Sequence, residues 1–303
     1  MNIGWKSVAW SAAVLFLLLS IPTMLNIVTL FLLMTPMVVL YTMLKPLSFA
    51  AHMACVVAAA FLLSGSYAPV ALTFGLFFLI PSIVMGHLYK KRTAPKKVIL
   101  IGFVVLLAQL LLELIVLSMQ FDLDLSAYLT QLLEETARAL NTSGTLLPED
   151  WASDTADQLS NAIVTMLPAL LLLASFALAS VTHILSRRAL AISGIETPAL
   201  PQMRTWMLPR SMVFYYLIAL VLSFVIPADS NNFLSMVTAN AVPVLRFAFT
   251  IQAIAFFFYL ASVKGWHKAV PVLIAVPILL YPPFYLIGLL DVAFPLRKNF
   301  TRM

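Results

Sequence analysis

The stretch that decides the fold is FDLDLSAYLTQLLEETARALNTSGTLLPEDWASDTADQLSN, residues 121–161. It interrupts two long hydrophobic halves and holds eight of the chain's 12 carboxylates, but only one cation, Arg138. Under the positive-inside rule, a segment so poor in Lys and Arg is expected on the non-cytoplasmic side of a membrane. We therefore expect 121–161 to be an extracytoplasmic insert within a single transmembrane domain over 1–303.

The insert is patterned as two helices. Apolar residues recur at helical spacing from Leu125 to Leu140, which predicts an amphipathic helix of about four turns. The sequence Leu147-Pro148-Glu149-Asp150-Trp151 predicts the start of a second helix, because proline suits a first turn and carboxylates favour its dipole. That helix is expected to continue towards the next membrane span.

Composition indicates the class of protein. Hydrophobic residues make up 62% of the chain and charged residues 10%, with a mean hydropathy of +1.02. A soluble domain has about 45–50% apolar and about 25% charged residues. The sequence therefore predicts a multi-pass protein of the cell membrane, whose first partner is the lipid bilayer.

The net charge of +6 does not indicate nucleic acid, because the cations cluster at the ends of the apolar runs. There they orient the spans and meet anionic lipid head groups. Cys55 is the only cysteine, which excludes an intrachain disulfide and a thiolate metal site.

Eight apolar runs have lengths that suit tilted transmembrane helices. They are Val8–Ile21, Met24–Leu44, Leu47–Leu63, Pro69–Leu88, Val98–Met119, Ile163–Leu185, Met212–Ile226 and Val242–Val263. With the N-terminus in the cytoplasm, 13 of the 18 Lys and Arg residues fall inside and the acidic insert falls outside. A short outer turn is expected at Pro227-Ala228-Asp229-Ser230.

The last apolar segment, Ala269–Phe294, leaves two alternatives open. Four prolines divide it, and Arg297, Lys298 and Arg302 follow. A ninth span, which we slightly favour, would place these cations outside. A re-entrant hairpin with its tip near Tyr281-Pro282-Pro283 would return them to the inside. The predicted fold is thus an all-α transmembrane helix bundle of eight spans, a proline-rich ninth span or re-entrant hairpin, and an outer amphipathic insert.

No motif for an enzyme, a metal site or a cofactor is present. The four histidines are scattered, and none has a second ligand at metal spacing. His87, His183 and His267 lie near predicted inner span ends and are expected at the interface or at helix termini. His52, inside a span, is expected to form a hydrogen bond to a neighbouring helix. We expect no catalysis.

Charged residues inside predicted spans are the candidates for a site, because such charges are costly unless paired or functional. Glu113 and Arg246 fall at similar depth in the outer third of the bilayer, and Gln109 lies one turn below Glu113 on the same face. We expect these residues to line an outward-facing cavity under the insert, with Asp291 near its rim. Three alternatives remain: separate snorkelling to the interface, a structural ion pair, and a solute or proton site.

Small residues form a second signal. Ala9 and Ala13 make a small-xxx-small pair on the first span, a spacing that lets helices approach closely. The pair serves either packing within this chain or docking of another membrane subunit.

The chain resembles the YybS-like family of bacterial polytopic membrane proteins. Gly86–Arg92 closing a span, the long outer insert, and Gly288–Asp291 with Phe294 and Arg297-Lys298 carry the likeness. The alanine-rich first span and the glycine-terminated fourth span are distantly similar to the substrate-binding components of energy-coupling-factor transporters. That resemblance implies a small-molecule solute held near the outer face and a membrane partner subunit docked at Ala9 and Ala13.

The function that these observations favour is solute binding related to transport, without catalysis. The alternative is a structural or regulatory membrane protein that acts by binding partners, with the insert as its interaction surface.

Overall fold

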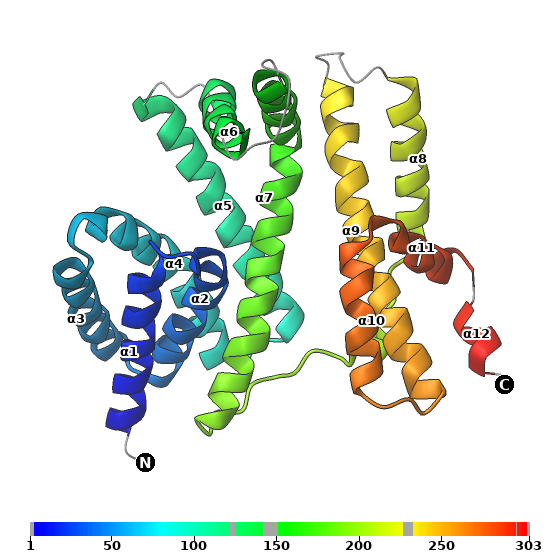
Figure 1. Cartoon of the computed structure of the whole chain (residues 1–303). Helices are drawn as coiled ribbons and strands as arrows, with labels where there is room; N and C mark the ends of the chain where they lie inside the picture. The colour runs from blue at the N-terminus through cyan, green and yellow to red at the C-terminus, as the bar shows by residue number, and fades with distance from the viewer. Residues whose placement is uncertain (1–2, 122–124, 142–150, 227–232, 295, 302–303) are drawn as a thin grey trace. The chain divides into compact units, whose positions relative to one another are not determined.

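The computed structural model describes residues 3–121, 125–141, 151–226, 233–294 and 296–301, and every regular element within these ranges is helical (Figure 1). Five helical segments are long and apolar enough to cross a membrane: Asn26–Met43, Pro46–Lys90, Pro95–Val116, Trp151–Ile192 and Phe233–Val263. Shorter apolar helices accompany them. The all-helical membrane class is confirmed, while the count of eight spans stays a prediction.

Each of the eight predicted apolar runs matches a helix, with at most two residues at either end outside it. In chain order these are α1 Ile3–Ser20, α2 Asn26–Met43, α3 Pro46–Ser64, α4 Ala68–Lys90, α5 Pro95–Phe121, α7 Trp151–Ile192, α8 Ser211–Val225 and α9 Phe233–Val263. Prolines begin several of them, because a first turn needs no proline N–H: Pro46 begins α3 and Pro95 begins α5. Short 3-10 turns occupy Gly65–Tyr67 (η1) and Met203–Thr205 (η2).

The amphipathic helix of the insert is present as α6, Leu125–Asn141. The second insert helix is the beginning of α7, which runs 42 residues without a break from Trp151. At 1.5 Å per residue α7 is about 63 Å long, twice the hydrocarbon thickness of a bilayer. The Ser160 hydroxyl donates to the Ser126 carbonyl at 2.9 Å and joins α7 to α6. Pro148–Asp150 and the predicted turn at 227–230 lie outside the described residues.

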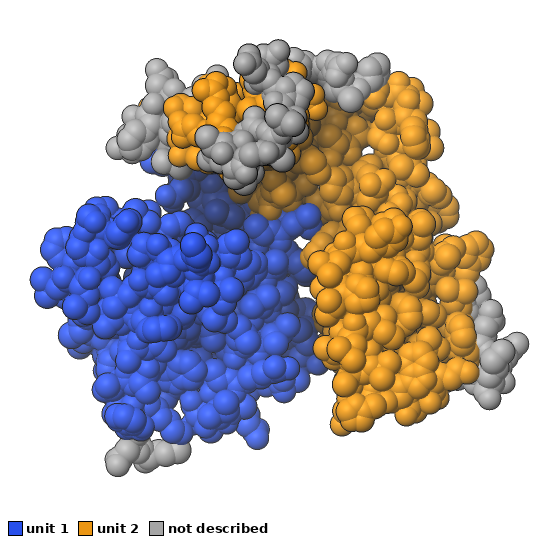
Figure 2. All heavy atoms as spheres, viewed as in Figure 1, with its two compact units in different colours: residues 1–116, 173–200 blue, residues 117–172, 201–303 orange. Residues whose placement is uncertain are grey.

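The chain divides into two compact units, coloured separately in Figure 2. Unit 1 comprises 1–116 and 173–200, and unit 2 comprises 117–172 and 201–303. Both α5 and α7 contribute residues to each unit. The sequence had predicted a single transmembrane domain over 1–303.

In unit 1 the helix ends that were predicted to be cytoplasmic meet. Lys6 at the start of α1 donates to the Ser193 carbonyl just after α7, at 3.4 Å. Lys90 at the end of α4 donates to the Leu44 carbonyl after α2, at 2.6 Å. Each contact brings two of these helix ends together: the start of α1 with the end of α7, and the end of α4 with the end of α2. The orientation of these ends in a membrane stays a prediction.

Unit 2 contains a helical hairpin at its C-terminal end. Helix α10, Ala269–Leu280, is followed by an extended Tyr281, the 3-10 turn η3 (Pro282–Phe284), α11 (Tyr285–Ala293) and α12 (Leu296–Thr301). The residue before a proline avoids the α conformation, which ends α10 before Pro282. With 12 residues, α10 is about 18 Å long, too short for a straight span of about 30 Å. The break lies where the hairpin alternative, which we had ranked second, placed its tip. Re-entry into the membrane at this point stays a prediction.

Candidate functional site

The strongest polar cluster of unit 2 is built on Asp291 of α11, whose side chain is fully buried. Its Oδ2 accepts hydrogen bonds from Gln252 Nε2 at 2.6 Å and from Arg297 Nη2 at 2.9 Å. Arg297 Nε donates to both carboxylate oxygens, at 3.1 and 3.2 Å. The buried charge is therefore matched by a cation and an amide, as burial of a carboxylate requires.

Gly288 brings α11 against α9 so that this cluster can form. A Cβ on Gly288 would lie 1.9 Å from the carbonyl oxygen of Phe249 and 2.7 Å from the amide nitrogen of Ala253. The two backbones touch where a side chain would otherwise separate them. One turn further along α11, Asp291 meets Gln252 of α9.

The cluster also fixes the segment that enters unit 2. Gln252 Oε1 accepts from the Leu208 amide at 3.0 Å, and Arg297 Nη1 donates to the Arg204 carbonyl at 3.0 Å. The Tyr259 hydroxyl donates to the Arg297 carbonyl at 2.8 Å. The hairpin therefore returns the chain to the end of α9 that carries Tyr259. Arg297 there lies beside the segment 201–208.

A second polar group surrounds Arg246, near the turn of the hairpin. Arg246 Nε donates to the Tyr216 hydroxyl at 3.3 Å, and Tyr216 donates to the Tyr285 hydroxyl at 2.8 Å. The guanidinium carbon lies 5.3 Å from the centre of the Tyr285 ring. Arg246 is exposed on unit 2, and no carboxylate lies within ion-pair distance of it in the part of the chain that the structure describes. Most of its donors remain available to an anion.

The buried amide of Asn240 joins α9 to α7 next to a proline. Asn240 Oδ1 accepts from the Ala169 amide at 2.8 Å, and Nδ2 donates to the Thr165 carbonyl at 2.9 Å. Pro168 lies between these two positions of α7 and lacks an N–H. A neighbouring side chain thus satisfies backbone groups beside the proline, as membrane helices require.

The structure distributes the predicted site residues over both units. Glu113 and Gln109 belong to unit 1, and Arg246 and Asp291 belong to unit 2. Gln109 Nε2 donates to the Phe77 carbonyl at 3.0 Å, and Glu113 is half-buried. The pairing of Glu113 with Arg246 stays a prediction. Asp291, expected at a cavity rim, is instead buried and paired with Arg297.

The predicted docking residues lie on α1. Ala9 is exposed and Ala13 is half-buried, whereas Val14 and Leu18 of the same helix are buried in unit 1. The docking of a partner subunit there stays a prediction.

His87, in the last turn of α4, and His267, in the loop after α9, lie at helix ends as expected, whereas the other two histidines lie inside helices. His52 Nδ1 shares a hydrogen bond of 2.9 Å with the Ser11 hydroxyl of α1, which confirms the expected bond to a neighbouring helix. His183, expected at an interface, is buried in unit 1, with Nδ1 2.7 Å from the Tyr89 hydroxyl. Among the described residues no group of His, Cys, Asp or Glu could hold a metal ion.

Sequence reasoning missed Gln252, Arg297, Tyr216 and Tyr285. Arg297 had been used for the topology and for the family resemblance, but not as a site residue. Gln252 carried a signal, since a glutamine inside an apolar run demands a partner. No feature of the sequence marked Tyr216 and Tyr285 as site residues, because interfacial tyrosines are common in membrane helices.

Comparison with known proteins gives two matches. The model of the family described as "Predicted membrane protein (DUF2232)" matches residues 11–292. The uncharacterized protein YybS of Bacillus subtilis (strain 168) is 24% identical over 297 residues, which cover 95% of this chain and 94% of the relative. No solved structure matches. The resemblance expected from Gly86–Arg92 and Gly288–Asp291 is thereby confirmed.

Proposed function

Since the chain belongs to the DUF2232 family of predicted membrane proteins, we propose that it is a multi-pass protein that binds a small anionic solute, in a role related to transport. Arg246 is the residue that holds the anion. Tyr216 and Tyr285 position the guanidinium and supply hydroxyl groups beside it. The N-terminus is assigned to the cytoplasm and the insert to the outside, from the distribution of cations.

The observation that carries this proposal is an exposed guanidinium halfway along an apolar helix with no carboxylate partner among the described residues. Arg246 is 13 residues from Phe233, so it lies about 20 Å along a helix of about 46 Å. A charge inside a membrane span is costly unless it is paired, hydrated or bound to a ligand. A solute anion would accept hydrogen bonds from the guanidinium donors that the two tyrosines do not occupy.

The broken helices beside Arg246 support the same proposal. Transporters commonly build their solute sites where transmembrane helices are discontinuous, because unpaired backbone groups and helix ends can face a ligand there. In unit 2 the break at Tyr281–Phe284 separates α10 from α11, and Tyr285 at the start of α11 contacts Arg246. We infer that the solute reaches Arg246 from the side of the insert, through an outward-facing cavity.

Thermal unfolding of the purified protein tests this proposal. Small carboxylates and phosphates are added one at a time, each with a neutral analogue of similar size. A ligand at 100 times its Kd stabilises the folded state by about 2.7 kcal/mol, so a true solute raises the Tm measurably. Arg246→Gln should abolish the rise, and Arg210→Gln, which removes an exposed cation at the start of α8, should retain it.

An anion that stabilises the parent and Arg246→Gln equally would contradict the role of Arg246. If no anion stabilises the parent, and a specific protein co-purifies with it, the alternative of a structural or regulatory membrane protein is favoured instead.

A further inference from the structure

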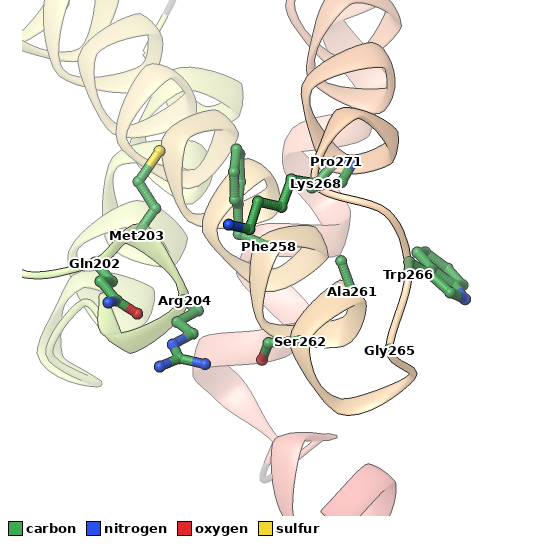
Figure 3. A pocket seen from close by; sticks show the side chains of 10 residues that line it. All are labelled: Gln202, Met203, Arg204, Phe258, Ala261, Ser262, Gly265, Trp266, Lys268 and Pro271. Atoms are coloured by element: carbon green, nitrogen blue, oxygen red, sulfur yellow. The ribbon is translucent and has the colours of Figure 1, made fainter.

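A pocket of about 680 Å³ opens in unit 2 at the Val263 end of α9. Figure 3 shows its two walls: Gln202, Met203 and Arg204 on one side, and the loop with Gly265 and Trp266 on the other, with the Lys268 side chain between them. Phe258, Ala261 and Ser262 of α9 lie between the walls, and Pro271 of α10 completes the lining. The pocket is distinct from the site around Arg246, because Arg246 lies 12 residues before Phe258, the first residue of α9 that lines the pocket.

Local backbone structure explains why a pocket forms at this point. Gly265 adopts a positive φ of 66°, which ends α9 in the left-handed conformation that glycine tolerates. The Trp266 amide then donates back to the Ala261 carbonyl at 2.9 Å. This cap turns the chain away from α9 before α10 begins at Ala269 and leaves space between the loop and η2.

The charged side chains that line the pocket are all positive. Two of its lining residues, Arg204 and Lys268, are cations, and none is a carboxylate. Both cations are exposed, and no other side chain forms an ion pair with either of them within the described part of the chain. The buried carboxylate of Asp291 already forms an ion pair with Arg297. The pocket therefore attracts an anion.

The rest of the lining is apolar, and this restricts the kind of anion. Phe258, Met203, Ala261 and Pro271 offer hydrocarbon surface next to the two cations. Helix α10, which starts at the pocket, carries Val272, Leu273 and Val276, and each of these residues is more than half exposed. Trp266, on the loop before α10, is 40% exposed, and tryptophan concentrates at the head-group level of membranes.

From these features we propose that the pocket binds a phosphate group carried by an anionic phospholipid. Arg204 and Lys268 contact the phosphate, and Ser262 and Gln202 lie within the same pocket to meet a polar head group. The acyl chains run along the exposed apolar face of α10. Basic pockets between membrane helices at the cytoplasmic side are suited to such head groups, and this is the side to which the cation pattern assigns Lys264–Lys268.

Native mass spectrometry of the purified protein in an uncharged detergent tests the proposal. The probes are phosphatidylglycerol, phosphatidylcholine with the same acyl chains, glycerol phosphate and inorganic phosphate. The parent should bind phosphatidylglycerol at least about tenfold more tightly than phosphatidylcholine, a difference of about 1.4 kcal/mol. Neither soluble phosphate should displace the lipid at equal concentration.

The matched variants separate this pocket from general surface charge. Arg204→Gln with Lys268→Gln should lose the preference for phosphatidylglycerol. Arg210→Gln with Lys264→Gln removes two exposed cations that do not line the pocket, and should retain it. Arg204→Lys with Lys268→Arg keeps both charges and should also retain it, which guards against a loss caused by misfolding. Arg246→Gln should leave lipid selectivity unchanged, so failure of the solute proposal would not affect this one.

Equal binding of the two lipids by the parent would overturn the proposal. So would a retained preference in the Arg204 and Lys268 double glutamine variant. If glycerol phosphate or inorganic phosphate displaces the lipid from the parent but not from that variant, the pocket is a site for a soluble phosphate and the lipid assignment is wrong.

Discussion

Gly288 of α11 lies so close to Phe249 of α9 that a Cβ on the glycine would be 1.9 Å from the phenylalanine carbonyl oxygen. No side chain fits in that space. The contact holds the returning arm of the hairpin against α9, and the polar cluster of Asp291 depends on it.

The first prediction follows from this contact. Gly288→Ala should destabilise the protein by at least about 1–3 kcal/mol, because the obstructing atoms are backbone and cannot swing away as a side chain would. Thermal unfolding in detergent measures the loss. Gly4→Ala is the control, since a Cβ there meets nothing within 4 Å and alanine favours a helix. Equal Tm values for the two variants would show that α11 does not pack on α9 in this way.

The second prediction concerns the ion pair of Asp291 and Arg297. Asp291 is 0% exposed and Arg297 17% exposed, so removing either partner leaves the other charge poorly solvated. Asp291→Asn and Arg297→Gln should each cost about 3–5 kcal/mol, and the double variant should cost less than the sum. Unfolding of the four proteins gives the coupling energy.

An exposed ion pair in the insert is the control for Asp291 and Arg297. Glu134 and Arg138 form an ion pair one turn apart on α6, with 72% of the Arg138 side chain exposed. Exposed pairs of this kind contribute about 0–1 kcal/mol. Glu134→Gln should therefore change stability little. Additive losses for Asp291→Asn and Arg297→Gln would rule out a direct interaction between them.

The third prediction concerns Asn240, whose amide satisfies backbone groups of α7 on both sides of Pro168. Asn240→Leu removes the two hydrogen bonds that join α9 to α7, which should cost about 0.5–1.5 kcal/mol for each bond lost. Asn161→Leu, at an exposed position of the same α7 helix, should cost much less. Equal stability of the two variants would contradict the role of Asn240.

The helices themselves were predictable because their signals are local. Apolar runs bounded by prolines and cations predicted eight segments, and α1 to α5 and α7 to α9 match them. The spacing of apolar residues from Leu125 predicted α6. His52 also behaved as expected, since a lone polar side chain in a span needs a partner on a neighbouring helix.

The candidate site was less predictable because it depends on contacts between distant parts of the chain. Asp291 finds Gln252 only because Gly288 allows close approach and because the chain reverses at Tyr281–Phe284. Four prolines predicted a break in the last segment. They did not predict which side of the break would pack against which face of α9. The burial of His183 was missed for a similar reason, because it depends on packing in unit 1 against Tyr89, which lies 94 residues earlier in the chain.

The central claim is that the chain from Ala269 to Thr301 returns to the side of the loop 264–268, because the contact of Tyr285 with Arg246 and that of Arg297 with Arg204 both depend on the hairpin. Single cysteines at Thr301, His267 and Ser153, in a Cys55→Ala background, test it by labelling intact cells with an impermeant thiol reagent. Thr301→Cys and His267→Cys should both be protected until the membrane is permeabilised, while Ser153→Cys should label at once. Labelling of Thr301→Cys in intact cells, with His267→Cys still protected, would contradict the account.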